Sequence, residues 1–199
     1  MRGEAFAQAA QEARRLGADT PVPMIDFSRN YFELFGLAPA FAIDGARLEQ
    51  AFRDLQAQVH PDRFAHATET EKRLSMQWAT HINEAYQTLK NPITRARYLL
   101  SLHGVDTAEE TNTVMPADFL MAQMEWREAI QEARQAGEIG ELDHLAGKLR
   151  REMHALEDEL ARDIDEAHDY VHAAATVRKL RFLEKLREEI HAALEALES

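Results

Sequence analysis

The chain has 199 residues and contains no cysteine. It therefore cannot form a disulfide, a zinc site with thiolate ligands or an iron–sulfur cluster held by thiolates. No apolar run approaches the roughly 18 residues that a membrane helix needs, and no convincing alternating strand pattern is present. Gly36, Gly104 and Gly137 stand where helices are expected to end, and they do not form a nucleotide-binding loop. Because helix-forming residues dominate and no strand pattern is present, the sequence predicts an all-α fold.

The negative charge is concentrated in the C-terminal half of the chain. The formal net charge is −12 at pH 7. Residues 27–103 contain nine Lys/Arg and eight Asp/Glu, whereas residues 104–199 contain 11 Lys/Arg and 23 Asp/Glu. Nucleic acid is therefore not an expected partner, because binding phosphates requires a clustered basic surface. The acidic half is better suited to a basic protein partner.

Two amphipathic stretches flank the tripeptide His60-Pro61-Asp62, and the rest of the chain is organised around them. Pro61 is expected to end the first helix, because it lacks an N–H and biases His60 away from helical geometry. The spacing of the apolar residues predicts a helical hairpin with the tripeptide at its tip. The apolar stripes are Leu48, Phe52, Leu55 and Val59 on the first helix, and Leu74, Trp78, His81, Ile82, Ala85 and Leu89 on the second.

Capping residues mark the ends of the hairpin helices. Asp44 is a fitting N-cap for the first helix. Thr68 and Glu71 have the spacing of a capping box at the start of the second helix, which Asn91-Pro92 should end. Two shorter helices are expected. One spans residues 28–37, is capped by Ser28 and should pack Tyr31, Leu34 and Phe35 onto the hairpin. The other runs from Pro92 to His103 with its apolar side chains inward, namely Ile93, Ala96, Leu99 and Leu100.

The C-terminal part predicts an antiparallel three-helix bundle. Helical stretches are expected over residues 118–136, 141–167 and 170–197, and short connections between long helices imply antiparallel neighbours. The predicted divisions are an N-terminal extension at 1–26, a first domain at 27–104, a linker at 105–117 and the bundle at 118–199.

Taken alone, the residues with chemical potential have ordinary explanations. A His–Asp pair can serve acid–base catalysis, but no nucleophile or cofactor motif accompanies His60 and Asp62, so an exposed helix-ending turn is favoured. Leu and Met at helical spacing near residue 121 predict bundle core, with the acids beside them as a solvated rim.

Three segments together resemble a J-domain in their order and spacing. These are YFELFGL at 31–37, HPDRF at 60–64 and INEAYQTL at 82–89. Further segments resemble one branch of J-proteins, the HscB family of iron–sulfur cluster assembly: RARYLLSLHG at 95–104, FLM at 119–121 and VRKLRFL at 177–183. The resemblance covers about residues 27–198.

The J-domain resemblance implies a docking surface for an ATP-hydrolysing heat-shock chaperone of the DnaK family. Within that family, a chaperone of the HscA kind is the expected partner. In such domains the tripeptide stimulates hydrolysis while the catalytic groups belong to the partner, so the chain is not expected to be an enzyme. Asp62 offers an acceptor that an arginine can pair with bidentately. J-domains carry a basic face on the helix before the tripeptide, which steers docking. In this sequence Glu49 and Asp54 partly offset the positive charge of that face. The implied docking residues are His60, Pro61, Asp62, Arg63, Arg47 and Arg53.

The HscB resemblance also implies a binding face for an iron–sulfur scaffold protein of the IscU type. The resemblance thus favours an exposed binding face for the Leu/Met stretch near residue 121, whereas spacing alone favours bundle core. A Met-rich apolar patch is adaptable, and acids beside it can meet basic residues of a partner. The implied face consists of Leu120, Met121, Met124, Glu125, Glu128, Glu132, Arg181 and Phe182.

Two histidines, His168 and His172, are four residues apart, a spacing that can hold zinc on a helix. No third ligand is evident and the His-Glu-x-x-His pattern is missing, so neither a metal nor a cofactor is expected.

The predicted function is that of an adaptor between chaperone and scaffold. A general J-domain co-chaperone that delivers unfolded clients is the alternative, although the Gly/Phe-rich linker and cysteine-ligated zinc module of such proteins are missing. The N-terminal segment lacks the apolar stretch of a secretory signal, and its acids argue against a mitochondrial transit peptide. The bacterial cytoplasm is therefore the expected location, with the mitochondrial matrix as the alternative, and no membrane partner is expected.

Overall fold

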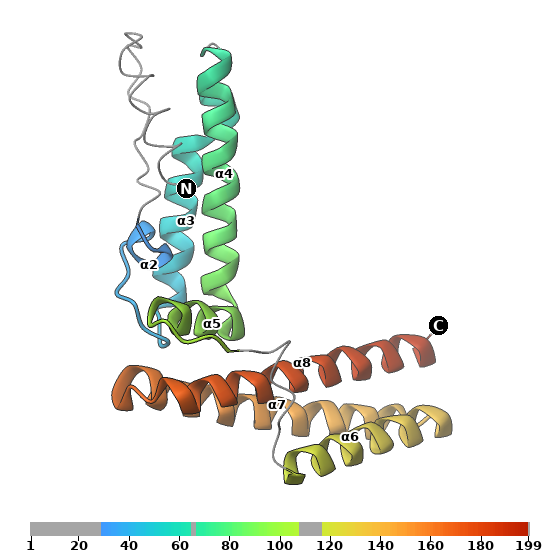
Figure 1. Ribbon diagram of the computed structural model, residues 1–199. Helices are drawn as coiled ribbons and strands as arrows, with labels where there is room; N and C mark the ends of the chain where they lie inside the picture. The colour runs from blue at the N-terminus through green and yellow to red at the C-terminus, as the bar shows by residue number, and fades with distance from the viewer. Residues whose placement is uncertain (1–28, 65–66, 108–116, 199) are drawn as a thin grey trace. The chain divides into compact units, whose positions relative to one another are not determined.

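A computed structural model describes residues 29–64, 67–107 and 117–198 of the chain (Figure 1). The described residues form helices and turns without a strand, which confirms the predicted all-α class. None of their helices is long and apolar enough to cross a membrane. The elements are α2 (Tyr31–Leu34), α3 (Gly45–Val59), the 3₁₀ turn η1 (Pro61–Phe64), α4 (Glu69–Lys90), α5 (Pro92–Leu102), α6 (Ala117–Ala136), α7 (Ile139–Ala161), the π-helical turn η2 (Arg162–Ala167) and α8 (Tyr170–Glu198).

The chain divides into two compact units, residues 1–95 and 96–199. The division falls within α5, whose apolar side chains Ile93, Leu99 and Leu100 are buried as predicted. The predicted extension at 1–26 and most of the predicted linker at 105–117 lie outside the described residues. The predicted domain boundaries therefore remain a prediction.

The first unit is built on the predicted hairpin of α3 and α4, which pack against each other along their length (Figure 1). Val59 of α3 and Leu74, Trp78 and Ile82 of α4 are buried. The Phe52 ring of α3 stacks on Tyr86 of α4 with a centroid distance of 3.9 Å. The apolar stripes in the sequence therefore face each other and form the core of the hairpin.

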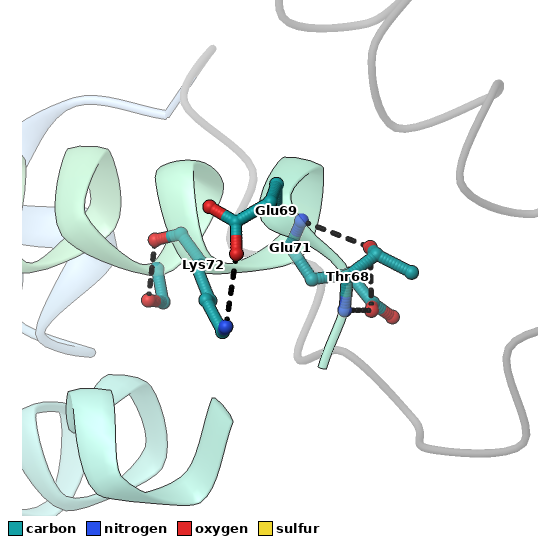
Figure 2. A network of polar contacts seen from close by, with 5 residues as sticks. Thr68, Glu69, Glu71 and Lys72 are labelled. Carbon is teal, nitrogen blue, oxygen red and sulfur yellow. Dashed lines mark hydrogen bonds and ion pairs between the residues drawn. The ribbon is translucent and has the colours of Figure 1, made fainter. Parts of the chain in front are cut away.

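Side-chain caps fix the predicted starts of both hairpin helices. The Asp44 carboxylate accepts from the backbone N–H groups of Ala46 and Arg47 at 2.9 and 3.1 Å. Figure 2 shows the capping box at the start of α4. There Thr68 Oγ1 accepts from the Glu71 N–H at 3.3 Å, and the Glu71 carboxylate accepts from the Thr68 N–H and hydroxyl at 2.8 Å each.

The first helix is shorter than the sequence predicted. It spans Tyr31–Leu34 rather than residues 28–37, and its cap is Asn30 rather than Ser28, which lies outside the described residues. Asn30 takes this role because Glu33, three residues later, completes a reciprocal capping box with it at 3.0 Å in each direction. Gly36 closes the helix as predicted, in a left-handed conformation with φ +64°.

The second unit contains the predicted three-helix bundle. Helices α6, α7 and α8 contact one another pairwise and run side by side in Figure 1. Gly137, with φ +71°, allows the chain to turn between α6 and α7. The core of the bundle contains Trp126, Ile130 and Ala133 from α6, Leu142, Leu145, Leu149, Met153 and Leu160 from α7, and Val177, Leu180, Leu183, Leu186 and Ile190 from α8.

The second helix of the bundle differs from the continuous helix predicted over 141–167. It starts at Ile139, ends as an α-helix at Ala161 and continues as the π-helical turn η2. His168 then reverses the chain with φ +55°, a conformation that is uncommon outside glycine. Its ring Nδ1 lies 2.9 Å from the Ile164 carbonyl, a contact that holds this turn.

Candidate docking surfaces

The tripeptide turn has a fixed backbone. His60 ends α3 in an extended conformation, with φ −60° and ψ 132°. The Arg63 N–H donates to the His60 carbonyl at 3.0 Å. Phe64 is 5% exposed and anchors η1, which lies against α4. The turn is therefore stabilised by the packing of Phe64 and by the backbone hydrogen bond between Arg63 and His60.

The polar side chains of the turn face solvent. The His60 and Asp62 side chains are 59% and 90% exposed. The Asp62 N–H donates to His60 Nδ1 at 3.3 Å, and that nitrogen lies 3.5 Å from Asp62 Oδ2. Arg63 reaches back to the Ala57 carbonyl at 3.4 Å. The Asp62 carboxylate is consequently presented to a partner on a rigid turn, where an arginine can pair with it bidentately.

The basic face of α3 is partly neutralised within the helix. Arg47 and Arg53 are both exposed. The Arg53 guanidinium pairs with the Glu49 carboxylate at 2.7 Å and donates to the Gln50 side-chain oxygen at 3.0 Å. The sequence predicts that Glu49 offsets part of the positive charge on this helix, and the ion pair with Arg53 does so. Arg47 is therefore the stronger source of positive potential on α3.

Three large apolar side chains on α6 are exposed. Leu120, Met121 and Met124 are 46%, 62% and 72% exposed, respectively. The core interpretation of this stretch, favoured by spacing alone, is wrong: the face of α6 that packs into the bundle is formed by Trp126 and Ile130. An apolar cluster on the solvent side of a bundle helix marks an interaction surface more often than a single exposed residue does.

Phe182 of α8 is held beside this cluster by two contacts. Its ring meets the Phe119 ring of α6 edge to face, with centroids 5.5 Å apart and planes at 77°. The Arg127 guanidinium lies over the same ring at 5.5 Å from its centroid and reaches Glu189 at 3.8 Å. The half-buried Phe182 of α8 therefore packs on α6 between Phe119 and Arg127 with a defined ring orientation.

The charged residues predicted for this face lie on α6 and α8. Glu125, Glu128 and Glu132 are exposed along α6. The Arg181 guanidinium forms a short contact with the nearly buried Glu184 carboxylate, so it is fixed in position next to Phe182. We call the predicted scaffold-binding residues of α6 and α8 the α6 face; they are Leu120, Met121, Met124, Glu125, Glu128, Glu132, Arg181 and Phe182.

Sequence reasoning missed the supports of this face. Phe119 and Arg127 were not predicted as site residues, yet they orient Phe182. Arg127 lies three residues after Met124 on α6. No periodic signal distinguishes such an arginine from a solvated one, because its contact is with a ring on another helix. Phe119 was visible in the sequence only as part of the FLM segment.

The two predicted zinc-spaced histidines do not converge. His168 Nδ1 lies 2.9 Å from the Ile164 carbonyl. His172 Nδ1 lies instead 2.8 Å from the Asp163 carboxylate. The left-handed conformation of His168 ends the helical register between the two residues, so the i, i+4 spacing does not bring their rings together.

A His-Pro-Asp turn at the tip of a packed helical hairpin, with the His60 and Asp62 side chains in solvent, is the arrangement of a J-domain protein. Family comparison agrees: residues 30–98 match the family described as "DnaJ domain", and residues 115–191 match "HSCB C-terminal oligomerisation domain". The chain belongs to the HscB co-chaperone family. HscB proteins are co-chaperones and not themselves enzymes, and a J-domain implies a partner chaperone of the DnaK type.

Relatives of the chain cover both of its halves. It is 56% identical over 175 residues to the "Co-chaperone protein HscB homolog" of Aromatoleum aromaticum, covering 88% of this chain and 99% of that one. Among solved structures, chaperone HscB from Vibrio cholerae matches with a TM-score of 0.75 and 38% identity, over 85% of this chain and 99% of that one. Human co-chaperone protein HscB matches with a TM-score of 0.79 and 31% identity, over 84% of this chain and 83% of the human one.

Proposed function

We propose that this protein stimulates the ATPase of an HscA-type chaperone through its HPD turn and brings an IscU-type scaffold protein to that chaperone through the α6 face. The proposal rests above all on the exposure of Leu120, Met121 and Met124. Large apolar side chains grouped in solvent are unfavourable in free energy. A partner that covers them removes their apolar surface from water and gains binding free energy. An adaptor holding both partners raises their effective concentration for each other.

The chaperone half of the proposal is supported by the geometry of the turn. Asp62 presents a carboxylate that is 90% exposed, on a turn that packs against α4 through the buried Phe64. Binding to a preformed turn loses little conformational entropy, and a charged pair with an arginine adds a directional hydrogen bond. The stimulating group is therefore rigid before the chaperone arrives.

The test of this half is the steady-state ATPase rate of a purified HscA-type chaperone. Asp62→Ala should abolish stimulation and leave the helicity of the protein unchanged, because the side chain makes no packing contact that the fold needs. Asp54→Ala is the matched control, since it removes another exposed carboxylate from the adjoining helix, and it should not reduce stimulation. Normal stimulation by Asp62→Ala would refute the assignment.

The scaffold half is supported by the composition of the α6 face. Its apolar residues are flanked by Glu125, Glu128 and Glu132, which suit a partner with basic residues around an apolar patch. The double variant Leu120→Ala/Phe182→Ala should weaken scaffold binding, measured by calorimetry, and retain basal stimulation of the chaperone. Unchanged scaffold affinity would remove the α6 face from the proposal and leave the J-domain assignment intact.

One comparison separates the two candidate functions. The ATPase is measured with this protein, with the scaffold, and with both. Stimulation by both together far above either alone supports the adaptor role. Stimulation by this protein with no further effect of the scaffold supports a general co-chaperone that delivers unfolded clients.

We further propose the bacterial cytoplasm as the site of action. The proposal is supported by bacterial relatives such as the HscB homolog of Aromatoleum aromaticum. Fractionation of cells that express the full chain tests it, and recovery in another compartment would contradict it.

A further inference from the structure

A polar cluster at the corner between α7 and α8 has no role in the function proposed above. It consists of Glu159 near the end of α7, Asp163 in η2 and His172 in the first turns of α8. The π-helical turn and the left-handed His168 bring the start of α8 back beside the end of α7. The fold thus gathers ligand-type side chains that the sequence separates by up to 13 positions.

The potential ligand atoms of the three residues all lie within 4.8 Å of one another. His172 Nδ1 is 2.8 Å from Asp163 Oδ2, and His172 Nε2 is 3.5 Å from Glu159 Oε1. Glu159 and Asp163 are four residues apart, so their side chains leave the same side of the helix. The imidazole lies between the two carboxylates.

The two carboxylates are partly shielded from water. The Glu159 and Asp163 side chains are 27% and 15% exposed, and His172 is 51% exposed. The hydroxyl of the fully buried Thr176 donates to Glu159 Oε1 at 3.0 Å. The His172 N–H donates to the Asp169 carboxylate at 3.0 Å, which fixes the backbone under the ring. A hydrogen bond such as that from Thr176 to the Glu159 carboxylate orients a metal ligand and strengthens metal binding.

We propose that Glu159, Asp163 and His172 form a binding site for one divalent transition-metal ion of the zinc type. One imidazole nitrogen and two carboxylate oxygens make a three-ligand set that leaves further positions for water. The imidazole favours zinc and its neighbours in the transition series over magnesium and calcium, which prefer oxygen ligands alone. The ion would join the end of α7 to the start of α8.

The ion requires a small rearrangement of the cluster. Ligand atoms of a tetrahedral zinc ion with bonds near 2.1 Å lie about 3.4 Å apart. In the structure the carboxylates face different nitrogens of the His172 ring, so binding must bring both to one nitrogen. The ring is half exposed and Glu159 has three rotatable side-chain bonds, so rotation of these two side chains supplies the movement without displacing a helix.

The test is calorimetric titration of the full chain, free of affinity tags and chelator, with ZnCl₂ and separately with MgCl₂. Zinc should bind in a saturable one-to-one manner and raise the midpoint of thermal unfolding, and magnesium should do neither. His172→Gln and Asp163→Asn should each weaken zinc binding by about tenfold or more, since even losing an outer-shell partner costs roughly 10–100-fold.

The matched control is His154→Gln. His154 lies on α7 within 3.4 Å of the Glu157 carboxylate, so it offers the same pair of residue types without a third ligand. It should bind zinc as the unaltered chain does. Circular dichroism confirms that each variant remains helical, and Asp163→Asn serves if His172→Gln fails to fold. Absence of saturable zinc binding, or zinc binding by His172→Gln and Asp163→Asn with unaltered affinity, would overturn the proposal.

Discussion

Replacement of Met121 by alanine tests the α6 face with little disturbance of the fold. Met121 is 62% exposed on α6, so the bundle core does not depend on it. A partner that covers the side chain does depend on it, because the covered apolar surface is removed from water. We therefore expect Met121→Ala to weaken scaffold binding and to leave the midpoint of thermal unfolding nearly unchanged.

The exposed fraction sets the size of the effect. Fully burying a methionine side chain contributes about 1.5–3 kcal/mol. A partner that buries the 62% still exposed on Met121 therefore gains roughly 1–2 kcal/mol. At about 1.4 kcal/mol per factor of ten, the dissociation constant should rise about 5- to 30-fold. Met124, 72% exposed, should give a larger loss than Leu120, 46% exposed, when each is replaced by alanine.

The assay is calorimetric titration of an IscU-type scaffold into each variant. Met76→Ala is the matched control, because Met76 is also 62% exposed but lies on α4, away from the α6 face in the sequence and in the other compact unit. It should leave scaffold affinity unchanged. Equal losses in Met121→Ala and Met76→Ala would refute the reasoning, since exposure alone, and not position on α6, would then govern the effect.

Three further predictions concern single side chains. Arg127→Ala should lower scaffold affinity about two- to five-fold in the same calorimetric assay, because it removes a cation–π contact of about 0.5–1 kcal/mol that orients Phe182; an unchanged affinity would show that the ring needs no such support. The hydrogen bonds from Thr68 lower the pKa of Glu71 below its ordinary 4.5. The ionised carboxylate therefore stabilises the fold above pH 4.5, and that stability is lost as the pH falls through the lowered folded-state pKa. Urea unfolding should show Glu71→Gln less stable than the unaltered chain at neutral pH, with the difference shrinking below pH 4.5; a difference independent of pH would contradict this origin. Burial lowers the pKa of His81 below 6.5, so the imidazole should titrate by NMR with a midpoint under that value, and stability should fall relative to His81→Gln as the pH drops below 6.5; a midpoint at or above 6.5 would contradict it.

The helix starts were predictable where one residue acts on its immediate neighbours. Asp44 and the Thr68–Glu71 pair cap their helices as predicted, because a cap is a hydrogen bond across two or three residues and needs no tertiary partner. The same rule would have found Asn30, which has Glu33 at the capping-box spacing. Ser28 and Asn30 are both good N-cap residues, and only the capping box distinguishes them.

Burial on short elements was harder to predict. Of Tyr31, Leu34 and Phe35, which were expected to pack onto the hairpin, Phe35 is 5% exposed and the Tyr31 ring meets His81 of α4 edge to face. The completely buried residue of α2, however, is Phe32, which the sequence did not single out. A helix of four residues has too few turns for periodicity to reveal which side faces inward. The π-helical turn η2 was likewise invisible, since its residues have no spacing that differs from an α-helix.

The sequence alone determined the all-α class, the hairpin with His60-Pro61-Asp62 at its tip and the approximate ends of the bundle helices, because apolar periodicity, proline and side-chain caps act over a few residues. Only the tertiary structure decided which side of α6 faces out. Met121 and Ile130 lie on opposite sides of α6, each near other apolar residues at helical spacing, and only the side with Ile130 is buried against α7 and α8. Only the fold, likewise, could bring His172 to Glu159, since that approach depends on how two helices meet across a turn.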